Sequence, residues 1–236
     1  MERIRIPNVA SYLPISLADL MVVGPVAARL LFRATLPGRI LGTLTLGAYA
    51  GSAFLDWAQR QGVRKIDFRR QYGAGVGRQR PMPRGARLRD AEYLVRELNR
   101  HYTPMAIPRR ELAVAVDLHL TEYISRITGQ RVETSSEVRE FMLAQLLFPF
   151  ALGACDPLTG DVALFRKLGV FEPHVLAHEF AHRKGYWKEL EAQALAYLAL
   201  MESEDPVLVQ SARCERLYRQ LWVLAREDSE EGRTRA

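Results

Sequence analysis

The stretch from Pro173 to Met201 constrains the fold more than any other part of the chain, because it reads as two helices joined by a glycine turn. Pro173 suits the first turn of a helix, where the amide hydrogen that proline lacks has no partner within the helix. Gly185 follows His182 by three residues and can adopt the positive φ that reverses the chain. A second helix then runs from about Trp187 to Met201. The sequence therefore predicts a helix–turn–helix unit whose second helix can fold back toward the first.

The first of these helices carries the pentapeptide His-Glu-Phe-Ala-His at 178–182. His178 and His182 are four residues apart, so both imidazoles project from one face of the helix. Two neutral imidazoles in this arrangement can bind zinc at about 2.0–2.1 Å, and the carboxylate of Glu179 can reach a water at the metal as general base. Glu189, in the first turn of the second helix, can swing back as a third ligand. The pattern predicts a catalytic Zn²⁺ site, because the fourth position stays open for water.

Several other residues are candidates for supporting roles. Glu191 competes with Glu189 as the third ligand, but it faces elsewhere on the helix, whereas Gln193 lies one turn beyond Glu189 on the same face. A catalytic site also needs a donor for the oxyanion or for the cleft. The candidates for this role are His174, Tyr186, Tyr197, Tyr218 and Arg213. A surface helix with two histidines and an acidic face is the alternative interpretation of the whole pattern.

The stretch "HEFAHRKG...ELEAQ" resembles the gluzincin class of zinc peptidases. In that class a His-Glu-x-x-His helix is followed by a helix bearing Glu-x-x-Ala-Asp. The resemblance implies that Glu189 is the metal ligand. It also places Gln193 where the class has an aspartate that orients a histidine ligand.

The chain resembles more closely a bacterial membrane-associated family, the domain of unknown function 3810. The residues that carry this resemblance are "LPISLADL", "DPLTGD", "HEFAH", Gly185, "ELEAQAL" and "LAYLAL". Gln193 stands where that family's pattern has asparagine or aspartate. The resemblance implies a zinc site in a membrane-associated protein.

Two apolar stretches near the N-terminus predict a transmembrane helical hairpin over residues 1–58. The stretch 36–58 carries no charge from 40 to 55 and is long enough to cross a hydrocarbon core of about 30 Å. The stretch 12–32 contains Asp19 and is the second candidate span. Basic residues before the first span and after the second place both ends in the cytoplasm by the positive-inside rule. A pair of buried helices is the alternative.

The net charge of +6 is concentrated in one part of the chain. From Asp56 to Arg110 there are 14 lysines and arginines against 5 aspartates and glutamates. We expect this basic juxtamembrane segment, residues 59–110, to lie against anionic lipid headgroups. Nucleic-acid binding is not expected, because no recognition helix, RNP motif or zinc finger accompanies the charge.

The remaining patterns complete the predicted fold. Apolar spacing predicts helices over 88–100, 109–129 and 135–148, and a short strand over 161–165. The fold class is therefore mainly α: the membrane hairpin, followed by a compact zincin-like domain over 59–236 with at most a small β element. Two cysteines make no disulfide framework.

These predictions converge on a zinc metalloendopeptidase tethered to the bacterial inner membrane, with its catalytic domain in the cytoplasm and a peptide or protein as substrate. Two alternatives stay open. One is a soluble regulatory protease that cuts a repressor-like protein. The other is a non-enzymatic membrane scaffold with a relict zinc site.

Overall fold

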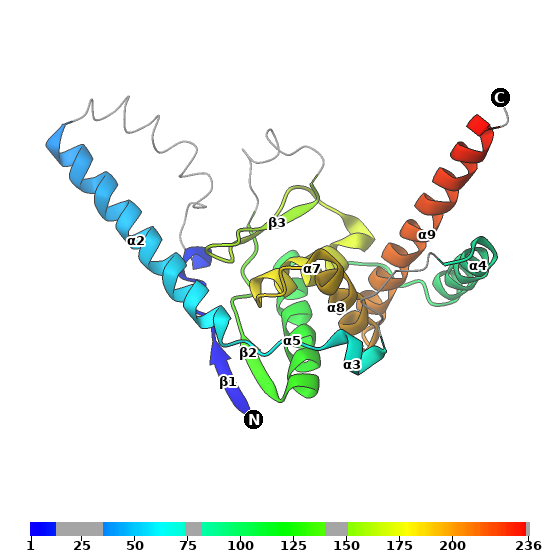
Figure 1. Cartoon of the computed structure of the whole chain (residues 1–236), viewed down its shortest axis with the longest axis horizontal. Helices are drawn as coiled ribbons and strands as arrows, with labels where there is room; N and C mark the ends of the chain where they lie inside the picture. Colours follow the sequence, from blue (N-terminus) through cyan, green and yellow to red (C-terminus); the bar gives the residue numbers. More distant parts are fainter. Residues whose placement is uncertain (13–34, 74–81, 140–150, 235–236) are drawn as a thin grey trace.

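The computed structural model describes residues 1–12, 35–73, 82–139 and 151–234 (Figure 1). Within these ranges the elements, in chain order, are β1 (Glu2–Arg5), the 3₁₀ turn η1 (Val9–Tyr12), α2 (Leu36–Gln61), α3 (Phe68–Tyr72), α4 (Arg84–Arg100), α5 (Arg109–Thr128), β2 (Gln130–Glu133), β3 (Gly153–Cys155), β4 (Val162–Leu164), η2 (Gly169–Phe171), α7 (Glu172–Arg183), α8 (Glu189–Met201) and α9 (Pro206–Thr234). The prediction of a mainly helical fold is confirmed.

The hydrophobic core forms where α7 packs against α5, α8 and α9. α7 turns Leu176 and Phe180 into this core, where both are fully buried. They meet Leu120 of α5 and Leu200 of α8, also fully buried. α7 and α8 therefore lie in the middle of the molecule, while α2 and the C-terminal part of α9 extend away from it on opposite sides (Figure 1).

The helices closest to the predicted site begin and end nearly where the sequence patterns indicate. α5 ends at Gly129, whose φ of 70° is left-handed, as a glycine after a helix allows. α7 has Pro173 in its first turn. Gly185 has a φ of 92° and reverses the chain before α8. The predicted helix–turn–helix unit is confirmed.

Two small sheets flank the helices. β1 pairs in parallel with β2, and β3 pairs antiparallel with β4, which overlaps the predicted strand at 161–165. The helix expected over 135–148 is wrong for its described part, residues 135–139. There the side chain of Ser135 accepts a hydrogen bond from the amide of Glu137 in a local turn, and Arg139 pairs with Ala163 at the edge of β4. Residues 140–148 lie outside the described part of the chain.

The predicted transmembrane hairpin is wrong. None of the helices in the described ranges is both long enough and apolar enough to cross a membrane. The span at 36–58 falls within α2, which has 26 residues. Its glycines, threonines and serine are only weakly apolar, so they lower the mean hydropathy of the helix. Asp56, expected at a membrane interface, is buried and accepts a hydrogen bond from the amide of Asn8 at 3.0 Å. Apart from residue 12, the span at 12–32 lies outside the described residues.

Buried polar groups fasten the C-terminal end of α7 to the rest of the molecule. The guanidinium of Arg183 is fully buried and donates to the backbone carbonyls of Ser135, Glu137 and Gly160. Arg60 of α2 donates in turn to the carbonyl of Arg183 at 3.1 Å. The helix that carries the two histidines is therefore held by contacts from parts of the chain that are distant in sequence.

Lys184, the next residue, forms a buried ion pair. Its ammonium lies 2.7 Å from Asp117 and donates to the hydroxyls of Thr121 and Thr134 at 2.8 and 2.9 Å. We predict that Asp117→Ala lowers the free energy of unfolding by about 3–5 kcal/mol, because it leaves a buried charge without its counter-ion. Urea unfolding measures this loss. The double variant Asp117→Ala/Lys184→Met should recover most of the stability; equal losses in the single and double variants would contradict the prediction.

Candidate metal centre

The two histidines and the first glutamate of α8 meet at one point. Nε2 of His178 lies 3.1 Å from Nε2 of His182. The carboxylate oxygens of Glu189 lie 3.1 Å from the first of these nitrogens and 3.4 Å from the second. Among the described residues, these three form the group of side chains that could share a metal ion. Glu191 does not join them, because it pairs with Lys188 at 2.9 Å.

The separations of the three ligand atoms fit a zinc ion. Atoms that share a tetrahedral zinc at about 2.0–2.1 Å lie about 3.3–3.4 Å apart, close to the spacings of His178, His182 and Glu189. A four-residue spacing on α7 supplies two of the ligands, and the turn at Gly185 brings in the third. Two nitrogens and one oxygen are also a donor set that zinc accepts in catalytic sites.

The tautomers and charges of the histidines also suit metal binding. Nδ1 of His182 lies 2.8 Å from the carbonyl oxygen of Tyr186, so the ring donates there and turns the lone pair of Nε2 toward the site. Burial, together with the neighbouring His182, lowers the pKa of His178 to about 4. His178 is therefore neutral near pH 7, which is the form that binds a metal.

Glu179 is buried beside this cluster and is not one of the three ligands. Burial, with a further contribution from the charge of Glu189, raises its pKa to about 8. A cation at the two histidines would lower that pKa again. With such a cation bound, the carboxylate form of Glu179, which can accept a proton, would be favoured.

Two adjoining cavities meet at the cluster. One, of about 380 Å³, is lined by β3 and Trp187. The other, of about 260 Å³, is lined by Val175, Leu190 and Arg219 among others. His178, Glu179 and Glu189 line both cavities, so the cleft continues on either side of the candidate metal position.

The strand β3 forms one wall of the cleft with an open edge. Leu152 and Asp156, which flank β3, are hydrogen-bonded to Phe165 and Asp161 on the β4 side. In an antiparallel pair the bonded positions alternate, so the backbone groups of Gly153 and Cys155 point to the other edge. No strand among the described residues pairs with that edge.

Gly153 lets the backbone of β3 approach the carboxyl group of Glu179. A Cβ at this position would lie 3.0 Å from the carbonyl oxygen of Ala163 and 3.3 Å from Oε1 of Glu179. We predict that Gly153→Ala lowers the rate of any zinc-dependent hydrolysis at this site, but by less than about a hundredfold, because these contacts require smaller shifts than the ~1 Å that costs that much. Gly85→Ala is the matched control, since its Cβ would meet only Arg89, at an ordinary 3.6 Å. Equal rates for the two variants would contradict this role of Gly153.

The other predicted site residues are distributed around the cleft. Nε2 of Gln193 lies 2.6 Å from Nε2 of His174, so its amide contacts this histidine rather than either ligand histidine. His174 is buried, and burial lowers its pKa to about 3, so its ring is neutral and accepts from the amide. Both residues line the cavity on the Leu190 side. Nδ1 of His178 has no hydrogen-bond partner among the described residues.

The structure does not bring the remaining candidates for the oxyanion donor to the ligands. The hydroxyl of Tyr186 accepts from the amide of Ile66 at 3.2 Å. Tyr197 lies beside Arg216, and the ring of Tyr218 packs edge-on against Phe171. Arg213 pairs with Glu97 at 3.3 Å.

Several residues near the site were missed from the sequence. The indole of Trp187 stacks on the ring of His182, with centroids 5.9 Å apart and planes 10° from parallel. Arg60 lies over the same indole and donates to the carbonyl of Leu158, in the loop after β3. Arg219 enters the cleft from α9. No local motif marks Arg60 and Arg219, because they come from segments distant in sequence, whereas Trp187 follows His182 by only five residues.

Comparison with known proteins finds one family. The model of the family described as "Protein of unknown function (DUF3810)" matches residues 114–235, which is more than half of the chain. The match includes α7, α8 and α9 with the three candidate ligands, whereas β1 and α2 precede it. No curated protein and no solved structure matched.

Proposed function

We propose that this chain, which belongs to the DUF3810 family, is a zinc-dependent peptidase with a gluzincin-like active site. One observation carries the proposal: the ligand atoms of His178, His182 and Glu189 converge at zinc-like spacings in an open cleft, with the carboxyl group of Glu179 beside them. A closed structural zinc site would use four protein ligands and would need neither a cleft nor a buried carboxyl.

The roles of the residues follow from their positions. His178, His182 and Glu189 hold the metal, and Trp187 restricts the ring of His182 by stacking on it. A bound zinc ion supplies the Lewis acidity that makes water nucleophilic near neutral pH. Glu179 takes the proton of the attacking water and passes it to the departing amine.

The shape of the cleft supports an internal peptide bond as the substrate. The cavities on the two sides of the ligands leave room for chain on both sides of the bond that is cut. The open edge of β3 offers the backbone groups of Gly153 and Cys155 to an extended peptide, which would add as a strand. Hydrogen bonds of this kind bind any extended sequence, so side-chain pockets must provide the selectivity.

Hydrolysis of an unfolded protein, such as casein, tests the proposal. We expect cleavage that stops when a chelator removes zinc and returns when stoichiometric zinc is added. Metal analysis confirms that the chelator has removed the zinc. Cleavage of casein that continues in this zinc-free protein would show that the activity does not use this site.

A non-enzymatic scaffold with a relict zinc site is the second candidate function. Its support is that Gln193 contacts His174, and that Nδ1 of His178 finds no partner in the described part of the chain for the hydrogen bond that usually orients a ligand histidine. In this case the protein would bind zinc through the same three ligands but would cleave no peptide. The chelator experiment separates the two, because only a peptidase gives products that depend on zinc.

A further inference from the structure

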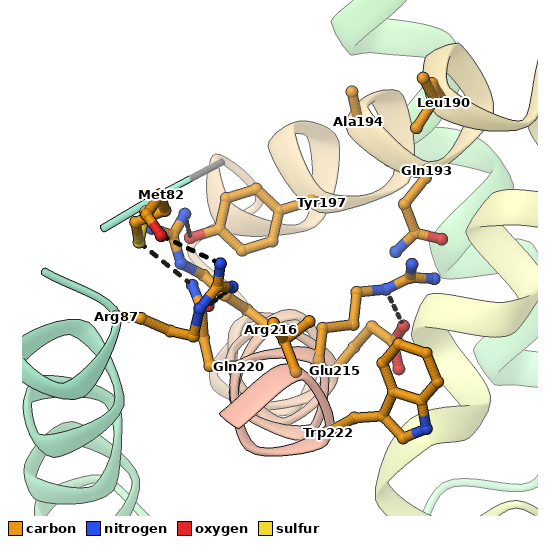
Figure 2. Close-up of a pocket in the computed structure, with 12 residues that line it drawn as sticks. Met82, Arg87, Leu190, Gln193, Ala194, Tyr197, Glu215, Arg216, Gln220 and Trp222 are labelled. Atoms are coloured by element: carbon orange, nitrogen blue, oxygen red, sulfur yellow. Dashed lines mark hydrogen bonds and ion pairs between the residues drawn. The ribbon is translucent and has the colours of Figure 1, made fainter. Parts of the chain in front are cut away.

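A groove lies between α8 and α9 (Figure 2). Its volume is about 500 Å³, within the range of about 300–1,000 Å³ that is usual for binding pockets. α8 forms one wall and α9 the other, and Met82 and Arg87 close one end (Figure 2). Leu190, Gln193 and Arg219 line both this groove and the cavity beside His178 and Glu179. The groove is therefore an extension of the cleft and not a separate pocket.

The walls of the groove present exposed apolar surface. Leu190 and Trp222 are 67% and 55% exposed, and they stand on opposite walls (Figure 2). Ala194 and Val223 add further apolar surface between them. Burying a large apolar side chain against such walls strengthens binding by at least about tenfold.

The arginines of the groove are already paired, so it has little net attraction for an anion. Arg216 binds both carboxylate oxygens of Asp90, at 2.9 and 3.0 Å, and lies over the ring of Tyr197. Arg87 lies 3.9 Å from the carboxylate of Glu227 and also donates to Gln220 at 2.9 Å. Arg219 pairs with Glu215 at 2.6 Å. The chemistry of the walls therefore favours a neutral, apolar occupant.

The distance from the metal site fits a peptide that spans both. Leu190 directly follows the ligand Glu189, and Tyr197 lies eight residues beyond that ligand on α8. At a rise of about 1.5 Å per residue, the groove reaches about 12 Å from Glu189. An extended peptide covers that distance with about four residues.

We propose that the groove between α8 and α9 binds apolar side chains of the peptide substrate, within about four residues of the cleaved bond. This inference rests on the proposed peptidase function and adds the substrate class to it: unfolded segments rich in aliphatic or aromatic residues. The groove supplies the side-chain selectivity that backbone hydrogen bonds to β3 lack.

Three variants isolate the groove from the metal site. Ala194→Arg fills it with a bulky charge, and Trp222→Ala removes one wall. Leu221→Ala is the matched control, because Leu221 is 51% exposed on α9 but does not line the groove. All three side chains are at least partly exposed in helices, so the fold and the zinc content should not change; thermal unfolding and metal analysis verify this.

The products of casein digestion are then sequenced by mass spectrometry. We expect wild type and Leu221→Ala to cut where aliphatic or aromatic residues lie within four positions of the bond on one side. Ala194→Arg and Trp222→Ala should lose this enrichment, with a drop in rate at the apolar sites of at least about tenfold. Wild-type cleavage without apolar enrichment, or enrichment that survives Ala194→Arg, would overturn the inference.

If the protein cleaves no peptide, the proposed peptidase function fails. A binding experiment then still tests whether the groove prefers apolar peptides. Two capped hexapeptides serve as probes, one with leucine and phenylalanine at its centre and one with serine and aspartate there. We expect the zinc-loaded protein to bind the apolar peptide at least about tenfold more tightly, and Ala194→Arg to abolish the difference. Equal affinities for the two peptides would overturn the inference on its own.

Discussion

Replacing Glu179 with glutamine should lower the rate of peptide hydrolysis by at least about a hundredfold and leave the zinc content unchanged. The amide keeps the size of the side chain but cannot accept the proton of the attacking water. Glu179 is not among the three residues whose atoms converge, so the metal should remain. The neutral amide also suits the buried position, where the charged carboxylate is disfavoured, so the variant should fold.

Glu191→Gln is the matched control for this prediction. Glu191 lies on α8 near the site but pairs with Lys188 on the surface. We expect its variant to keep the wild-type rate. If Glu179→Gln and Glu191→Gln hydrolyse casein equally fast, another group is the base and the assigned mechanism is wrong.

Removal of a ligand should have the largest effect on zinc binding. Loss of a residue that only hydrogen-bonds to a metal ligand weakens metal affinity by about 10–100-fold. We predict that His182→Ala and Glu189→Ala, which each remove a ligand, weaken zinc affinity by more than this. Competition with a chromophoric chelator measures this affinity. Glu191→Ala should bind zinc as the wild type does, because Glu189 reaches the two histidines whereas Glu191 pairs with Lys188.

Thermal unfolding gives a second measure of the same effect. Zinc at about one hundred times its dissociation constant stabilises the folded state by about 2.7 kcal/mol, if the unfolded chain does not bind it. In a chain of this size that corresponds to a rise in Tm of about 5–10 °C. The rise should be present in wild type and Glu191→Ala and absent in Glu189→Ala. A wild-type rise in Glu189→Ala would exclude Glu189 as a ligand.

The convergence of His178, His182 and Glu189 was predictable because its determinants are local in sequence. A four-residue spacing on a helix places His178 and His182 on one face whatever surrounds them. The turn at Gly185 reverses the chain and the next helix begins within a few residues. Glu189, in its first turn, therefore lies within 3.1–3.4 Å of the two histidines. Side-chain periodicity also located α4 and α5, since helical spacing of apolar residues depends on a single buried face.

The rest of the cleft depends on contacts between distant segments. Gly153 lines the same cavity as the two histidines because β3 packs beside α7. Arg219 reaches the cleft from α9, thirty residues beyond Glu189. No motif relates these residues to the histidines, so their roles became visible only in three dimensions.

The N-terminal prediction failed because absence of charge was taken as strong hydropathy. α2 carries no charge from residue 40 to 55, yet its small and weakly polar residues keep it below the apolarity of a spanning helix. Its C-terminal end instead takes part in polar contacts next to the candidate metal site, where Arg60 bonds to α7 and lies over the ring of Trp187. Sequence patterns alone could not distinguish a charged residue at a membrane interface from one buried against a neighbouring loop.

The most direct test of the central claim is X-ray absorption at the zinc edge of the protein loaded with one zinc ion. The account predicts two imidazole nitrogens at about 2.0–2.1 Å, with oxygen atoms completing the shell and no sulfur. Cys155 lines the same cavity as the histidines, so the measurement also tests whether its sulfur binds the zinc in place of a predicted ligand. A sulfur ligand at about 2.3 Å, or a zinc shell without two imidazoles, would contradict the assignment of His178, His182 and Glu189 as the metal centre.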